Sequence, residues 1–111
     1  MAEVEIGGKA VELRGAAYAA VAYSEEFGGD VWDALVALER KGGVPVLEVL
    51  RCAWALAKTA DVAAGRQSTP RFGAWCASLG QVNAAKLRKP VHDELADGVL
   101  FRAEEEARGG A

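Results

Sequence analysis

Apolar and polar residues alternate over the first thirteen positions, in two short runs separated by Gly7-Gly8. This alternation is typical of strands with one buried face, and two glycines suit a type I′ turn, in which both central residues need positive φ. The turn predicts a hairpin over about residues 3–13 with its apolar side chains on one face. The expected pairs are Ile6 with Lys9, Val4 with Val11, and Ala2 with Leu13. Because an isolated hairpin is marginal in water, that face should lie on helices or on a partner's strand.

After the hairpin the apolar spacing becomes helical, and glycine, proline and capping residues divide the chain into about five helices. Asp30 and Thr69 are the expected N-caps, and Pro45 and Pro70 the expected first residues of their helices. Pro90 disfavours helix at the residue before it, so we expect a break there after one or two turns. The expected helices span about 15–27, 31–41, 45–65, 70–80 and 90–108.

The same spacing predicts which side chains face the core. The expected stripes are Ala16, Ala20, Tyr23 and Phe27; Val31, Ala34, Leu35 and Leu38; Phe72, Trp75, Cys76 and Leu79; and Val91, Leu95 and Val99. The third helix is apolar nearly all round, which is typical of a helix packed on several sides. We therefore expect it at the centre of the bundle, with Trp54 as its largest side chain.

The length of 111 residues suits one domain. The sequence thus predicts a mainly α (α+β) fold: a hairpin, a helical bundle over about 15–103, and a flexible acidic tail over about 104–111. The net charge of −3 lacks the basic excess that nucleic-acid binding usually requires. No apolar stretch suits a membrane span, and the acidic N-terminus is unlike a signal peptide. We expect a cytoplasmic protein that binds neither nucleic acid nor membrane.

No set of nucleophile, base and orienting group can be assembled from the sequence. His92 is the only histidine, and we expect it exposed in the first turn of the last helix, with Asp93 and Glu94 pointing in other directions. Cys52 and Cys76 lack a Cys-x-x-Cys motif, so buried, reduced thiols are expected. The glycine pairs lack the context of a nucleotide-binding loop. We therefore expect no enzyme activity, and no catalytic, cofactor or metal site.

The last predicted helix contains three consecutive apolar residues, Val99, Leu100 and Phe101, before the chain becomes acidic. At about 100° per residue they span more of the helix circumference than one buried stripe. Either this helix is buried on two sides, or Leu100 and Phe101 form a face that binds a partner protein.

One stretch of the chain resembles a known family. The hairpin segment Glu5–Leu13 (EIGGKAVEL), an Ala/Tyr-rich helix ending in Glu25-Glu26-Phe27-Gly28, and Val31–Leu35 (VWDAL) resemble the opening of the tail assembly chaperones of long-tailed bacteriophages and gene transfer agents. The resemblance implies a non-enzymatic protein that binds the tape-measure protein and helps to recruit tail-tube subunits. It supplies no binding motif to carry over to single residues.

Two other functions stay open from the sequence: a structural phage neck or tail-completion protein, and a small regulatory helical binding domain. The open edges of the hairpin also allow self-association.

Overall fold

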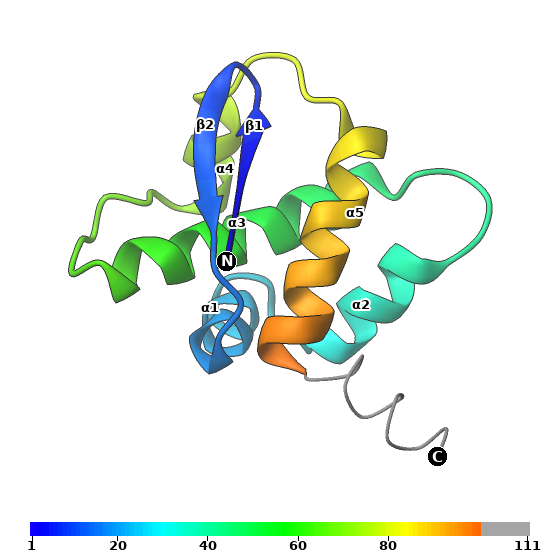
Figure 1. Ribbon diagram of the computed structural model, residues 1–111, viewed down its shortest axis with the longest axis horizontal. Helices are drawn as coiled ribbons and strands as arrows, with labels where there is room; N and C mark the ends of the chain where they lie inside the picture. Colours follow the sequence, from blue (N-terminus) through cyan, green and yellow to red (C-terminus); the bar gives the residue numbers. More distant parts are fainter. Residues whose placement is uncertain (101–111) are drawn as a thin grey trace.

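The computed structural model describes residues 1–100, which form an antiparallel hairpin, five α-helices and a closing π-helical turn (Figure 1). The elements are β1 (Ala2–Ile6), β2 (Lys9–Leu13), α1 (Ala17–Phe27), α2 (Val31–Glu39), α3 (Val46–Ala63), α4 (Phe72–Ala77), α5 (Ala84–Glu94) and the turn η1 (Leu95–Val99). The hairpin lies across α3, and α5 runs beside β1 (Figure 1). The predicted fold class, a hairpin followed by a bundle of about five helices, is confirmed.

The hairpin has the predicted register, with Ile6 opposite Lys9 and Val4 opposite Val11. Gly7 and Gly8 have φ of 57° and 86°, as a type I′ turn requires. Ile6 and Leu13 are fully buried against the helices, so the hairpin's apolar face has the helical support that the sequence demands.

Helix α3 is the centre of the bundle, as predicted. It contacts β2, α1, α2, α4 and α5, and its Trp54 is only 1% exposed. The Trp54 indole N–H donates to the carbonyl of Pro70 at 2.9 Å, so this buried donor has an acceptor. Pro45 is the N-cap and not the first helical residue, so the helix begins one residue later than expected, at Val46.

Helix α2 buries the four predicted residues, and the Asp30 carboxylate caps it by accepting the Trp32 amide at 2.8 Å. It ends at Glu39, before the expected Lys41. The Arg88 side chain of α5 donates to the carbonyls of Leu38 and Arg40, at 2.7 and 2.9 Å. It therefore supplies donors to carbonyl groups that have no partner within the helix at this end.

The buried face predicted for α1 is partly wrong. Ala19, Ala22 and Tyr23 are buried, whereas Ala16 lies before the helix at the N-cap and Ala20 is only half-buried. In a helix rich in alanine the faces differ little in hydrophobicity, so the sequence constrains its rotation weakly.

The predicted start of the fourth helix is wrong, because it begins at Phe72 after an N-cap at Arg71. Thr69 and Ser68 instead donate to the carboxylate of Asp61, at the end of α3. Trp75 is buried as expected, and the other members of its stripe are half-buried.

The expected break at Pro90 is also wrong. Helix α5 begins after Asn83, whose side chain accepts the Lys86 amide, and continues through Pro90 to Glu94. The ring removes one donor, but Lys86, whose carbonyl would have been its acceptor, is exposed. Packing of Leu87, Val91 and Leu95 against the core stabilises the helix on both sides of the proline.

Candidate functional site

The predicted contact residues Leu100 and Phe101 come directly after the turn η1. The Leu100 amide donates to the carbonyl of Leu95 at 3.3 Å, five residues back, which is the spacing of a π-helix. Val99 and Leu100 are half-buried and pack against the core. Because a π turn is wider than an α turn, the angle of 100° per residue does not hold here. Phe101 lies outside the described residues, as do the remainder of the predicted last helix and the predicted tail, so the binding face stays a prediction.

The turn η1 meets the segment that leaves the hairpin. The Gly15 amide donates to Glu94 Oε2 at 2.7 Å, and the amino group of Met1 lies 3.1 Å from the same oxygen. Gly98 lies against the backbone of Gly15 with no room for a side chain on either residue. The sequence gives no signal for this contact, which joins residues about 80 positions apart.

His92 is half-buried between α5 and α2, so the expected exposed position is wrong. Because α5 starts at Ala84, His92 lies near its end, where Nε2 is 2.7 Å from Glu39 Oε2 and Nδ1 is 3.1 Å from Asp93 Oδ1. Burial alone would lower the pKa of His92, but these two carboxylates together raise it above its usual value. The cluster joins two helices, and within residues 1–100 no group of three acidic, histidine or cysteine side chains is placed to hold a metal ion.

The second cluster joins α1 to α3 around Glu48. The Tyr23 hydroxyl donates to Glu48 Oε2 at 2.5 Å, and the Cys52 thiol lies 3.8 Å from the same oxygen. Burial, and then the neighbouring carboxylate, raise the pKa of both Tyr23 and Cys52 well above their usual values. Cys52 is therefore a protonated thiol, a poor nucleophile.

Asp61 holds the loop between α3 and α4. Its buried carboxylate accepts from the amides and hydroxyls of Ser68 and Thr69, and from Arg66 Nε at 2.9 Å. Burial would raise the pKa of Asp61, but these donors outweigh it and hold the pKa well below its usual value. The carboxylate is thus ionised and fully engaged in organising the loop.

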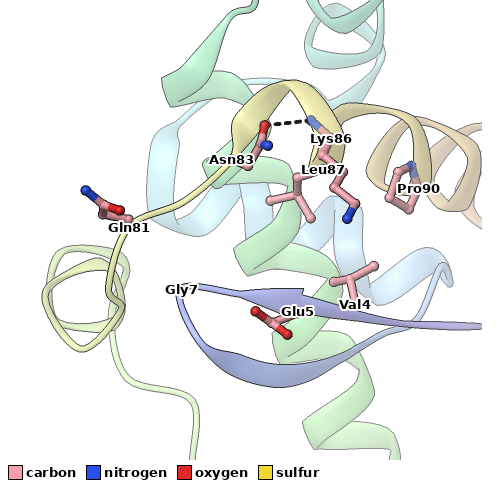
Figure 2. Close-up of a pocket in the computed structure, with 8 residues that line it drawn as sticks. All are labelled: Val4, Glu5, Gly7, Gln81, Asn83, Lys86, Leu87 and Pro90. Atoms are coloured by element: carbon pink, nitrogen blue, oxygen red, sulfur yellow. Dashed lines mark hydrogen bonds between the residues drawn. The ribbon is translucent and has the colours of Figure 1, made fainter.

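A groove of about 410 Å³ runs between β1 and the first half of α5 (Figure 2). Lys86 and Leu87 extend from α5 toward Val4 of β1, while Gln81 points away from them (Figure 2). The lining holds one carboxylate, Glu5, and one amine, Lys86, with no nucleophile beside them. The groove therefore presents one negative and one positive side chain beside the apolar side chains of Val4 and Leu87.

No helix within residues 1–100 is long and apolar enough to cross a bilayer. Comparison of the chain with protein-family models, with curated proteins and with solved structures finds no match to any of them.

Proposed function

We propose that this chain is a non-enzymatic tail assembly chaperone of a long-tailed phage or a related particle, acting in the cytoplasm of the bacterial host. One observation carries the proposal. The segment over residues 5–35, which resembles this family, holds a type I′ hairpin, a helix that ends at Gly28 in the left-handed conformation, and a second helix capped by Asp30.

The residues that end α1 have structural contacts that account for their pattern. Glu26 accepts the Phe72 amide at 2.8 Å and pairs with Arg71, which ties α1 to the start of α4. The Phe27 ring makes edge contacts with the rings of Tyr23, Phe72 and Trp54. A pattern of this kind builds a scaffold, and the proposed role needs a scaffold that presents a surface to other proteins.

The reactive side chains within residues 1–100 also favour binding over catalysis. Cys52 and Tyr23 are engaged with Glu48, and Asp61 with its own loop. On this proposal the chain acts through contacts with the tape-measure protein and the tail-tube subunits, with no metal or cofactor.

The experiment is co-expression with the tape-measure protein of the same phage or particle. A folded chain that keeps the tape-measure protein soluble and co-purifies with it supports the proposal. A chain that is folded, by circular dichroism, but leaves the tape-measure protein insoluble and unbound contradicts it.

The predicted contact face is tested in the same assay by the double variant Leu100→Glu, Phe101→Glu. It should weaken the complex and keep its helicity, whereas Asp97→Ala, at an exposed position nearby, should change neither. If the double variant loses its helicity, these residues belong to the core and the contact face lies elsewhere.

The content of purified particles distinguishes a chaperone from a structural tail component. A chaperone of this family is absent from the finished particle, so detection of the chain there by mass spectrometry would favour a neck or tail-completion protein.

A further inference from the structure

The outer edge of β2 carries backbone groups that no other part of residues 1–100 uses. Ile6 and Lys9 close a two-residue turn, so they form a hydrogen-bonded pair, and the pairs alternate from there. Ala10 and Glu12 belong to the other kind of pair, and their N–H and C=O groups point away from β1. No hydrogen bond within residues 1–100 reaches these four groups. These groups, on two residues that lie two positions apart, form an unpaired strand edge.

The two edges of the hairpin differ in what lies beside them. The outward groups of β1, on Glu3 and Glu5, face α5, which lies next to that strand (Figure 1). The edge of β2 lies on the opposite side of the hairpin, where it borders a hollow of about 240 Å³. Ala57 and Ala60 of α3 contribute to the lining of this hollow, with Trp75 and the loop 66–70. Ala57, Ala60 and Trp75 give the hollow an apolar part that an apolar side chain of one more strand can contact. The rest of the lining is polar: Asp61, Arg66, Ser68 and Thr69.

We propose that the edge of β2 binds an extended segment of a partner protein in which basic and apolar residues alternate. The segment adds a third strand to the hairpin and satisfies the outward groups of Ala10 and Glu12. Its apolar side chains lie on the same face as Val11 and Leu13, over the hollow. Its basic side chains lie on the other face, next to Glu12.

Charge selects this occupant. The outer face of the hairpin carries Glu3, Glu5 and Glu12, all exposed, and Glu3 lies directly opposite Glu12. Like charges opposite each other destabilise a strand pair, and an opposite charge on the next strand stabilises it. A lysine or arginine beside Glu12 offsets this repulsion in a way that no residue of the hairpin's own outer face does.

The same reasoning disfavours a second copy of this chain as the occupant. Two β2 strands paired about Val11 would bring the Glu12 side chains into diagonal positions, about 7–8 Å apart, within a face holding three carboxylates from each chain. The inference does not depend on the tail-assembly role, because it concerns the edge of one strand and the chemistry beside it.

The test uses the whole protein and a seven-residue peptide that alternates lysine and valine, followed by two-dimensional NMR. We expect saturable binding, with the amides of Ala10 and Glu12 shifted and their hydrogen exchange slowed. The amides of Glu3 and Glu5 should change little. The control peptide has the same side chains but is N-methylated on the amides that would face β2, so it keeps its charge and loses its pairing. It should bind at least tenfold more weakly.

Two matched variants distinguish the edges. Ala10→Pro removes an outward amide of β2, and Glu5→Pro removes the outward amide of the residue opposite it on β1; edge positions of this kind tolerate proline. Ala10→Pro should raise the dissociation constant at least tenfold, and Glu5→Pro should change it less than threefold. Glu12→Gln should weaken binding a few-fold and reduce its salt dependence.

Equal binding of the two peptides by the unmodified protein overturns the proposal, and this comparison needs no variant to fold. Loss of binding in Glu5→Pro with binding retained in Ala10→Pro overturns it too, in favour of the groove beside α5. A doubling of the protein's mass without peptide would assign the edge to a second copy instead.

Discussion

Gly15 and Gly98 lie backbone against backbone, although they are 83 positions apart in the chain. A Cβ atom built on Gly98 would meet the Cα and the carbonyl oxygen of Gly15 at 2.6 Å, and one built on Gly15 would meet the Glu94 carbonyl oxygen at a still shorter distance. These neighbours are backbone atoms, which cannot rotate away as a side chain can. The contact holds the exit of the hairpin against the π turn that follows α5.

Gly98→Ala should therefore destabilise the protein by about 1–3 kcal/mol or more, because the added methyl group must displace backbone. Urea unfolding measures the loss. Gly73→Ala is the matched control, since nothing lies within 4 Å of a Cβ there. Being in helix α4, it should be neutral or stabilising by up to about 1 kcal/mol. Equal stability of the two variants would contradict the close contact.

Stability should depend on pH through His92. Its folded pKa lies above the unfolded value of about 6.5, so the stabilisation by Glu39 and Asp93 is fully present below pH 6.5. It is lost as the pH rises through the folded pKa. Because the group is partly exposed, the change should stay below about 1 kcal/mol. NMR titration gives the pKa directly, and His92→Gln should remove this part of the pH dependence; a pKa at or below 6.5 would refute the assignment.

Asp61→Asn should cost about 2–4 kcal/mol at pH 7, because a buried carboxylate that accepts from five donor groups is replaced by a neutral amide. The folded pKa of Asp61 is depressed, so its stabilisation is present above the unfolded pKa of about 3.9 and is lost as the pH falls below it. Denaturant unfolding at pH 7 and pH 3 should show a smaller difference between variant and wild type at the lower pH. A difference that grows on acidification would contradict this.

Phe27→Leu should destabilise by about 1–2 kcal/mol, because it removes edge contacts to Tyr23 and Phe72, each with centroids 4.9 Å apart. The near-ultraviolet circular dichroism should weaken while the far-ultraviolet signal of the helices stays. Val21→Ala, on the exposed side of the same helix, should stay within about 0.5 kcal/mol of wild type. An unchanged near-ultraviolet spectrum in Phe27→Leu would mean that the ring cluster is not ordered in solution.

Only part of the candidate site could be predicted from the sequence. The run Val99, Leu100 and Phe101 attracts attention by its hydrophobicity, but the tertiary structure half-buries the first two against the core. The edge of β2 has the weaker sequence signal, because Ala10 and Glu12 are ordinary strand residues. Their importance depends on what lies beside each edge, which the register alone does not say.

Elements whose causes are local could be predicted from the amino-acid sequence. Alternation and two glycines were enough for the hairpin and its register, because a two-residue turn leaves one pairing. The buried face of α2 and its Asp30 cap follow from spacing within eleven residues or fewer. The central place of α3 follows from its composition, since a helix apolar on all sides must be covered on all sides.

Features that depend on partners far along the chain could not be predicted in this way. Ser68 and Thr69 donate to Asp61 and do not cap α4. Arg88 donates to a carbonyl at the end of α2, and α5 continues through Pro90 because its residues pack against the core. The π turn and the contact of Gly15 with Gly98 join the two ends of the described chain. In each case a local preference of about 1–3 kcal/mol competes with long-range packing and hydrogen bonds of similar size, and the assembled fold decides which prevails.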